Sequence, residues 1–555
     1  MNLSKAGLPS GSSFGGGRYG LGEVSEFVLI EGESAAIFGR ITEVRLPERE
    51  RLAVEDEAGV GVEVHAIGFV QLLATVSLKS MRVVPGIEAY PRLGDKVYSA
   101  PHSFIAKIPE LMTLKEHEEF KIPSVSLQIG HIKNAPENTI NITPEKLFGR
   151  HCAVLGATGG GKSYTVSRLI EESRKHQCKL ILLDATGEYR GLAGDVEHFH
   201  LGNPFKKAPG SKIASVPPTC FQEQDFIALF EPSGKVQGPK LRAAIRSLKM
   251  TAIDPSLANS QGVLEKINKA KAPIAAHEVT HAKALEDPKT PFDPSCLVEQ
   301  LRQECVFPSA NYGKDPTRWG DHSESDYNYC LSLITRISGI LSSSALAPVF
   351  QTTGNELTNV MDSFVSDQNA NRLLRICLSG ILTDFNAREV IANSIARYLL
   401  VLVLARNGAF RGKPTVVFLD EAHAFIGKSM GSEDFKTRLD AFEIIAKEGR
   451  KYELNICLAT QRPRDVPEGV ISQMGTLLVH RLSNDKDRDM VERACGDIDR
   501  SASSFLPNLQ PGEVALIGVD FPIPMTIQIA MPTTRPESDG ADYQKYWSKP
   551  SEAAE

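Results

Sequence analysis

The sequence has 555 residues, of which 62 are basic and 68 acidic, so its formal net charge at pH 7 is −6. Hydrophobic residues make up 42% and charged residues 23%, which is ordinary for a globular protein with ample core. This composition excludes collagen-like, wholly disordered and disulfide-scaffold proteins. The near-neutral charge also excludes a uniformly basic nucleic-acid coat, while a local basic groove remains open. At about 150 residues per domain, the length predicts roughly three or four domains.

The hydrophobic runs and the N-terminus predict a cytoplasmic protein. The longest strongly apolar run, 398–405, lies between Arg397 and Arg406 and is much shorter than the about 20 residues that span a bilayer. We therefore expect a buried helix there and no membrane segment. The N-terminus has no apolar h-region, so we expect no secretory signal. The cysteines form no C-x-x-C pair, which favours reduced core cysteines, and His198 and His200 are expected to bind no metal.

The N-terminal part is predicted to form a small β-barrel after a flexible start. Residues 1–24 are rich in Gly and Ser and are expected to be flexible. Within 25–135, short runs rich in Val, Ile and Ala at 35–44, 60–70 and 95–100 alternate with turn residues. Frequent short strands at this spacing are typical of a barrel or a sandwich.

After the barrel, the pattern changes to strand, loop, helix and strand, the signature of a parallel α/β sheet. We expect an α/β core at 136–200 and 366–530. The region between them, 201–365, has amphipathic helical periodicity at 240–250 and 327–341 and is predicted to be a mostly helical insertion. The apolar strand candidates of the core are 152–155, 180–183, 374–378, 416–419, 454–459, 476–479, 515–519 and 525–529, and a polar tail follows at 531–555.

The strongest motif is G-A-T-G-G-G-K-S at 156–163, which matches the P-loop (Walker A) pattern G-x-x-x-x-G-K-[ST]. It follows an apolar strand and opens a helix, as a P-loop should. Its glycines let backbone N–H groups curl around phosphates, Lys162 adds a cation, and Ser163 supplies a hydroxyl to Mg²⁺. We therefore predict that the chain binds ATP and Mg²⁺. The predicted nucleotide-binding residues are Gly156, Thr158, Gly159, Gly160, Gly161, Lys162, Ser163 and Tyr164.

A second motif, V-V-F-L-D-E at 416–421, is an apolar strand that ends in two acids. Such a run is common by itself, but beside a P-loop it is the expected partner (Walker B). Asp420 can ligate Mg²⁺ with Ser163, and Glu421 can polarise the attacking water, which favours hydrolysis over nucleotide storage. Two other strand ends stay open between a functional and a structural role. They are Asp184 and the pair Thr460–Gln461, which could sense the γ-phosphate or simply form a turn.

Other nucleotide-binding classes fit less well. A GTPase needs an N-K-x-D motif, and the candidate at 484–487 has these residues in the wrong order. An ABC ATPase needs an L-S-G-G-Q-like signature, which 378–381 matches only in part and too early in the chain. A small-molecule kinase rarely carries Asp-Glu at this strand end.

Five segments together resemble the HerA branch of the HerA–FtsK family of P-loop motor ATPases, over about residues 27–530. The G-R-K-Y followed by A-T-Q-R-P, and the late P-G-E, make this resemblance specific. It implies a RecA-like ATPase core, an N-terminal HAS-type barrel, and a homohexameric ring with DNA, duplex or partly opened, in a central channel. The segments are RHCAVLGATGGGKS (150–163), LLDATGEY (182–189), VVFLDEAH (416–423), EGRKYELNICLATQRP (448–463) and LPNLQPGEVALIG (506–518).

The resemblance also implies roles for individual residues. Lys162 and Ser163 bind phosphate and Mg²⁺, Asp420 ligates Mg²⁺, and Glu421 is the catalytic base. Arg450, Arg150 and Gln461 complete the predicted catalytic set. The two arginines match positions that reach transition-state charge, at least one from a neighbouring subunit, and Gln461 matches the polar sensor.

The family's ring usually serves a partner, which implies a nuclease or a sirtuin-like NAD-consuming effector. The expected function is therefore an ATP-driven DNA translocase or helicase in DNA end processing or antiphage defence. The alternative is a ring scaffold that activates its partner with little translocation, and a protein-unfolding ring is a weaker third reading. The stretch 427–438 is a candidate channel loop, since a mobile basic loop can follow phosphates, although an ordinary solvated loop fits it as well.

Overall fold

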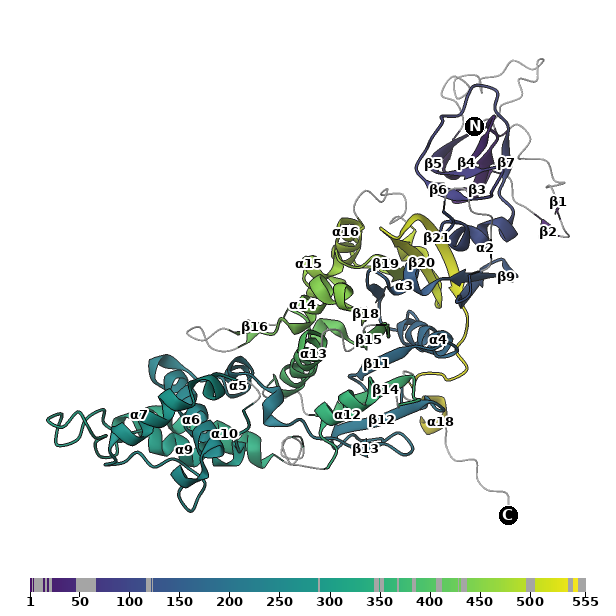
Figure 1. Ribbon diagram of the computed structural model, residues 1–555. Coiled ribbons are helices and arrows are strands. Elements are labelled where there is room, and N and C mark those ends of the chain that lie inside the picture. Colours follow the sequence, from purple (N-terminus) through teal and green to yellow (C-terminus); the bar gives the residue numbers. More distant parts are fainter. Residues whose placement is uncertain are drawn as a thin grey trace, which may run out of the picture. The chain divides into compact units, whose positions relative to one another are not determined.

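The computed structural model divides the chain into two compact units, each described separately below. Unit 1 comprises residues 1–176 and 460–531, and unit 2 comprises 177–459 and 532–555. Figure 1 labels the helices and strands. The structure describes residues 1, 3, 13–14, 17–18, 22–45, 66–115, 121, 123–287, 290–343, 349, 354–366, 369–381, 386–405, 412–427, 429–430, 437–495, 505–537 and 543–547.

Unit 1 begins with a five-stranded antiparallel sheet in the order β6-β5-β4-β3-β7, which confirms that the N-terminal part is rich in strands, and the unpredicted helix α2 follows it. Phe38 is fully buried at its centre, stacked on Phe27 with ring centroids 5.0 Å apart and in edge contact with Phe104. Much of the strand expected at 60–70 lies outside the described residues. The elements are β1 (Ser13–Phe14), β2 (Gly17–Arg18), β3 (Phe27–Ile30), β4 (Ala35–Arg45), β5 (Ile67–Ser77), β6 (Val83–Pro85), β7 (Val97–Ser99) and α2 (His102–Leu111).

The rest of unit 1 contributes strands in the order β10-β19-β20-β21-β8-β9. Only β10 and β19 pair in parallel here, with Cys152 opposite Thr476, while the other pairs are antiparallel. The elements are β8 (Leu127–Ile132), β9 (Ala135–Ile142), α3 (Pro144–Phe148), β10 (Cys152–Leu155), α4 (Lys162–Arg174), η7 (Pro463–Asp465), α15 (Glu468–Ile471), β19 (Thr476–Val479), α16 (Asp485–Ala494), η8 (Leu506–Asn508), β20 (Glu513–Gly518) and β21 (Phe521–Ile529).

Unit 2 is built on a parallel sheet in the order β13-β12-β14-β11-β15-β18, which confirms the predicted α/β class. Its central strands are short and buried along their length, as parallel strands covered on both faces must be. Strand β12 was not predicted, because its H-F-H segment lacks a continuous apolar run. The strands are β11 (Lys179–Asp184), β12 (Val196–Gly202), β13 (Lys212–Ile213), β14 (Leu373–Gly380), β15 (Thr415–Leu419), β16 (Ser429–Met430), β17 (Thr437–Arg438) and β18 (Leu454–Thr460).

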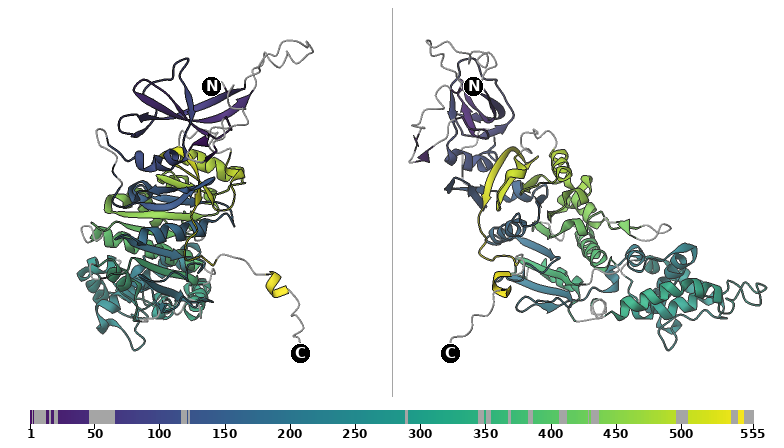
Figure 2. Two further views of the ribbon diagram at one scale, coloured as in Figure 1. Left: turned by 90° about the vertical axis from the view of Figure 1, so that its right-hand side faces the viewer. Right: turned by 180° about the vertical axis from the view of Figure 1, so that it is seen from behind.

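The helices of unit 2 fall into two groups. One group includes α13 and α14, which pack together beside the sheet, and the other is a bundle of α6, α9 and α10 within the insertion. The bundle remains one cluster when seen from behind (Figure 2). The helices are η1 (Pro218–Cys220), α5 (Glu223–Phe230), α6 (Gly234–Ile253), η2 (Pro255–Leu257), α7 (Lys271–Thr280), α8 (Ala282–Glu286), η3 (Pro294–Cys296), α9 (Leu297–Glu304), α10 (Glu324–Ser342), α12 (Leu357–Phe364), α13 (Ala387–Ala405), η5 (Ala422–Ala424), α14 (Ala441–Glu448), η6 (Gly449–Tyr452) and α18 (Tyr543–Trp547).

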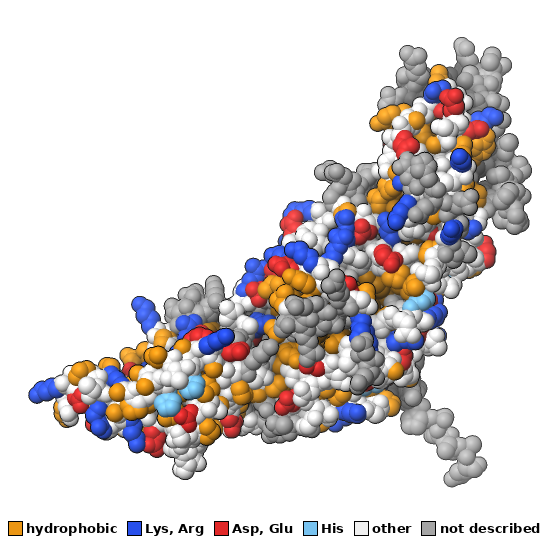
Figure 3. All heavy atoms as spheres, viewed as in Figure 1, with side chains coloured by type: hydrophobic (Ala, Val, Ile, Leu, Met, Phe, Trp, Pro, Cys, Tyr) orange, Lys and Arg blue, Asp and Glu red, His pale blue; other side chains and the backbone are white. Residues whose placement is uncertain are grey.

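The insertion has its own small core and is anchored to the sheet's helices. Met250, Leu264 and Leu285 are buried together in it. Asp225 of α5 binds Arg397 and Asn393 of α13 through buried contacts, which ties α5 to α13. In the space-filling view, hydrophobic and charged side chains are interspersed over these helices (Figure 3), as on an ordinary solvated surface.

Two further expectations can be compared with the described residues. All nine cysteines are free thiols, and seven are buried, as expected for core cysteines. Among the helices that the structure describes, none has the length and apolar character needed to cross a bilayer.

Candidate functional site

The P-loop lies in unit 1 between β10 and α4. Gly159 and Gly161 adopt φ values of +75° and +103°, which favour glycine, and Gly161 caps α4 without any side-chain hydrogen bond. A Cβ on Gly156 would lie only 2.5 Å from the Cβ of His480, so this close approach also requires glycine. The first backbone N–H groups of α4 are therefore not capped by a side chain and can receive an anion.

A buried histidine packs against the P-loop. His480 follows β19, and its Nε2 lies 2.8 Å from the Thr165 hydroxyl of α4. Burial, followed by the charge of Lys162, lowers the pKa of His480 to about 3. The ring is consequently neutral at physiological pH and adds no charge that would compete with Lys162.

Backbone hydrogen bonds from three other segments fix the loop. Gly156 N donates to the carbonyl of Thr460 over 3.3 Å, and Ala157 N donates to Arg481 O over 3.1 Å. Gly512, at a φ of +79°, donates its N–H to Gly160 O over 3.3 Å. The late P-G-E segment thus packs directly against the P-loop.

The polar side chains of the P-loop point to a phosphate ligand. Lys162 is largely buried, and its Nζ donates to Ala157 O over 3.2 Å, inside the loop itself. The Thr158 hydroxyl donates to the Gln461 side-chain oxygen, so the predicted sensor Gln461 contacts the loop. The glycine cradle and the internal lysine fit a nucleotide's phosphates. We call residues 156–163 with Gln461 the phosphate half-site.

A second group of candidate residues lies in unit 2, where β11 and β15 end side by side. Asp420 is 6% exposed, and its pKa is raised well above the usual value by burial and then by Asp184, Glu421 and Glu188. The Thr186 hydroxyl lies 3.5 Å from Asp420 Oδ2. We call Asp420, Glu421 and Glu188 the acidic half-site.

Glu421 is held in an unusual conformation beside Asp420. Its φ is +50°, a left-handed value that is uncommon for a glutamate and often marks a functional position. His423 Nδ1 lies 3.2 Å from Glu421 Oε2, which orients the carboxylate. The positions of Asp420 and Glu421 fit a pair of acids of which one binds a cation and the other accepts a proton.

Asp184 has a structural role, which resolves an alternative left open by the sequence. Its carboxylate accepts hydrogen bonds from Gly187 N over 2.7 Å and Tyr189 N over 3.1 Å. Arg375 of β14 adds two contacts, from Nε at 2.8 Å and from Nη2 at 2.6 Å. With these donors around it, Asp184 is suited to hold its loop rather than a metal.

The acidic half-site fits a divalent cation only as part of a larger site. Mutually repelling carboxylates favour a bound cation, because positive charge offsets the repulsion that raises the pKa of Asp420. Within the described residues, however, no group of three or more His, Cys, Asp and Glu side chains could hold a metal by itself. Mg²⁺ would therefore need further oxygens, such as those of the nucleotide phosphates.

The two predicted arginines are both exposed. Arg150 of unit 1 pairs with Asp520 at 3.5 Å, and Arg450 of unit 2 lies in η6. Of the candidate channel loop at 427–438, most lies outside the described residues.

Sequence reasoning missed several contributors. His480 and Arg375 sit within or directly after apolar strands, where a lone polar residue was visible but had no assigned partner. Glu188 was part of a quoted segment without a role of its own, and Gly512 belonged to the P-G-E segment. The role of each residue depends on contacts with residues that are far away in the sequence.

Comparisons with known proteins point to the HerA helicases. Residues 127–293 match the family model "Helicase HerA, central domain". The chain is 22% identical to the DNA double-strand break repair helicase HerA of Saccharolobus solfataricus, over 79% of this chain and 76% of that protein. It is 24% identical to the probable DNA double-strand break repair helicase HerA of Methanocaldococcus jannaschii, over 73% and 76%. These matches confirm the resemblance to HerA.

Among solved structures, the chain is similar to VirB4 of Thermoanaerobacter pseudethanolicus, with 14% identity and a TM-score of 0.44 over 77% of this chain and all of that one. It is also similar to the bacterial conjugative coupling protein TrwB, with 13% identity and a TM-score of 0.44 over 78% and 94%.

Proposed function

Because residues 127–293 match the model of the central domain of HerA helicases, we propose that the chain is an ATP-hydrolysing DNA translocase of that type. The observation that supports this proposal most directly is the pair of half-sites. One offers a glycine cradle with an internal lysine, and the other offers a buried aspartate beside a glutamate. A nucleoside triphosphate with Mg²⁺ is the ligand class that needs both.

In the proposed reaction, each residue has a distinct task. Lys162 and the N–H groups of the P-loop bind the β and γ phosphates, and Ser163 with Asp420 holds Mg²⁺. The cation, when bound, supplies positive charge to the phosphates. Glu421 accepts a proton from the attacking water, and Gln461 contacts the γ-phosphate side of the loop.

We further propose that the chain works as a homohexamer with duplex or partly opened DNA in a central channel. Arg450 and Arg150 are exposed, and we propose that they reach a neighbouring subunit's nucleotide, for which Arg150 would leave its partner Asp520. Arginine fingers are worth about 10³–10⁵ in rate in other NTPases, so turnover should depend on assembly. In this account the core is formed by 136–200 and 366–530, with the insertion at 201–365.

Assembly can be tested by mixing subunits. Rings of Arg450→Ala or Lys162→Ala subunits alone should be inactive, whereas mixed rings should regain part of the turnover through interfaces that combine one intact site with one intact arginine. Native mass spectrometry checks that the rings are hexamers. Mixed rings without any recovery, or a fully active monomer, would contradict the arginine in trans.

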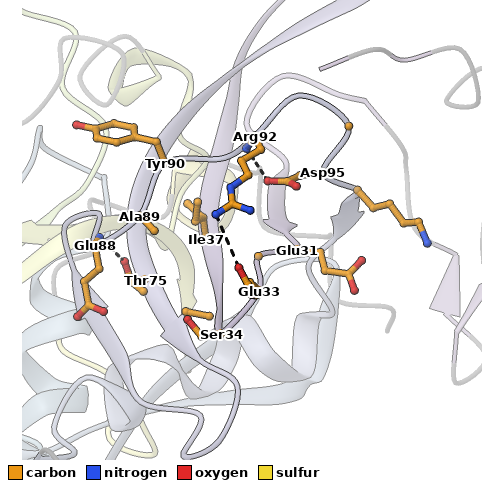
Figure 4. Close-up of a pocket in the computed structure, with 14 residues that line it drawn as sticks. Glu31, Glu33, Ser34, Ile37, Thr75, Glu88, Ala89, Tyr90, Arg92 and Asp95 are labelled. Carbon is orange, nitrogen blue, oxygen red and sulfur yellow. Dashed lines mark hydrogen bonds and ion pairs between the residues drawn. The ribbon is translucent and has the colours of Figure 1, made fainter.

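The N-terminal sheet is the proposed docking region for a partner nuclease or sirtuin-like effector in DNA end processing or antiphage defence. It carries a cavity of about 730 Å³ with an acidic rim that includes Glu31, Glu88 and Asp95. Figure 4 shows the Arg92 guanidinium pointing toward Glu33, at 3.7 Å. Such a rim suits a basic group of the partner.

The alternative function is a ring scaffold that activates this partner with little translocation. Pull-down of co-expressed proteins with wild type and Glu421→Gln separates the two. A DNA-stimulated ATPase whose Glu421→Gln variant still binds its partner but no longer supports partner activity favours the motor. Turnover that ignores DNA favours the scaffold.

A further inference from the structure

The segment that follows β21 returns to unit 2 and attaches to the loop after β11. Glu537 N donates to the carbonyl of Glu188 over 2.9 Å. The Glu537 carboxylate also binds the Arg190 guanidinium through two contacts. Thr534 packs nearby, since a Cβ on Gly191 would lie 3.4 Å from its Cγ2. Residues 532–537, which we call the strap, thus hold one end of this loop.

The other end of the loop is held from inside the sheet. Asp184 accepts the N–H groups of Gly187 and Tyr189, and Arg375 fixes Asp184. Residues 185–190 therefore run between a buried anchor and the strap. Within this stretch, the Thr186 hydroxyl faces Asp420 at 3.5 Å.

We propose that the strap positions the loop 185–190 against Asp420, so that Arg190 and Glu537 are positioning residues for the acidic half-site. This proposal rests on the proposed ATPase function. Neither residue touches the nucleotide in this account; both act through the backbone of Glu188.

The charge of Glu188 explains why its position matters. It is one of the carboxylates whose field acts on Asp420. Releasing the strap lets the Glu188 carboxylate shift, which changes the negative potential at the proposed cation site. The Arg190 and Glu537 side chains are 18% and 46% exposed, so solvent screens part of their attraction, and breaking the pair should release the strap without unfolding the unit.

The test uses charge reversal in the full-length chain. Arg190→Glu and Glu537→Arg are compared with the double variant, which restores the pair in opposite polarity. The matched control is Arg242→Glu with Glu223→Arg, an equally simple ion pair in the same unit, with side chains 52% and 48% exposed.

Each single strap variant should lower kcat for ATP about tenfold with KM unchanged, and the double variant should recover most of the loss. Amide hydrogen exchange of a peptide covering 185–190 should accelerate in the single variants and slow again in the double variant. The control pair should change neither quantity.

Wild-type turnover and wild-type exchange in both single variants would overturn the strap while leaving the ATPase proposal intact. A loss of kcat that the double variant does not rescue would also overturn it. If the wild-type protein hydrolyses no ATP at all, the proposed function is wrong, and the exchange measurement alone decides whether the strap positions the loop.

Discussion

The phosphate half-site and the acidic half-site are built on different physical principles. The first is made mainly of backbone: glycines at positive φ, a helix start, hydrogen bonds donated to the carbonyls of Thr460 and Arg481, and one accepted from Gly512. The second is made of charged side chains that repel one another and are held by the Arg375–Asp184 pair. A backbone loop that binds phosphate is encoded by a few consecutive residues. A network of charged side chains depends instead on which strands become neighbours in the fold.

Burial shifts the pKa of one ionisable group in each half-site, downward for a histidine and upward for an aspartate. His480 beneath the P-loop is kept neutral by a lowered pKa, so it asks for no counter-charge. Asp420 has a raised pKa because it is buried and, to a smaller extent, because other carboxylates lie near it. His480 thus adds no charge to the phosphate half-site, whereas the acidic half-site brings together carboxylates whose repulsion a cation would offset. Mutations in one half-site should therefore have effects that differ in kind from those of mutations in the other.

The largest effect is expected for Lys162→Ala. Removing the only ammonium group inside the described P-loop should lower ATP turnover at least about 10³-fold, because the phosphate charge is left uncompensated. Binding of a fluorescent ADP analogue should weaken in parallel. Lys175→Ala, at the exposed end of the same helix, is the control and should behave as wild type. Retained turnover in Lys162→Ala would show that the phosphates bind elsewhere.

Glu421→Gln should separate chemistry from binding. The amide keeps the shape of the side chain but cannot accept a proton, so turnover should fall by about 10²–10⁴ while nucleotide affinity is kept. Single-turnover ATP hydrolysis and equilibrium nucleotide binding measure the two quantities. Glu324→Gln, an exposed acid at the start of α10, serves as control. Equal losses in affinity and rate would assign Glu421 to binding.

Arg375→Ala should destabilise unit 2 more than any surface charge change. The Arg375 and Asp184 side chains are 1% and 0% exposed, so removing one partner leaves a buried charge and should cost about 3–5 kcal/mol. Urea unfolding measures the loss. The partly exposed pair Arg372–Asp195 provides the control, with less than about 1 kcal/mol expected for Arg372→Ala.

The double variant Arg375→Met with Asp184→Asn sharpens this prediction. It removes both charges, so it should be more stable than Arg375→Ala alone. A double variant that is no better would mean that packing, and not the uncompensated charge, dominates the loss.

The pH dependence of stability should carry the signature of His480. Its pKa is about 3 in the folded protein and 6.5 in the unfolded chain, so the unfolded chain binds more protons between these values. The contribution is therefore full above pH 6.5 and falls by about 1.4 kcal/mol per pH unit below it. Urea unfolding at pH 7.5, 6.5 and 5.5 should show a shallower decline for His480→Asn than for wild type. Parallel curves would contradict the neutral buried histidine.

Asp420 should contribute with the opposite sign. Its folded pKa is raised, so the folded state binds the proton more readily and this group's contribution increases as the pH falls. Asp420→Asn should remove that increase, which the same unfolding series detects.

The sequence predicted the α/β class and the strand–loop–helix setting of the P-loop, because these depend on local patterns. It assigned Asp420 and Glu421 from their place at a strand end. It left Asp184 undecided and overlooked Arg375, since their pairing joins residues far apart in the chain through neighbouring strands. His480 escaped notice for the same reason. Strand β12 was not predicted because its polar residues, among them His198 and His200, interrupt the apolar run that would indicate a buried strand.

The central claim is that this chain is a DNA-stimulated ATPase that uses both half-sites. Its most direct test is steady-state ATP turnover by the purified protein, with and without duplex DNA, for wild type, Lys162→Ala and Glu421→Gln. We predict turnover that DNA increases in the wild type and that disappears in both variants. Equal turnover in all three proteins, or none in the wild type under any condition, would contradict the account.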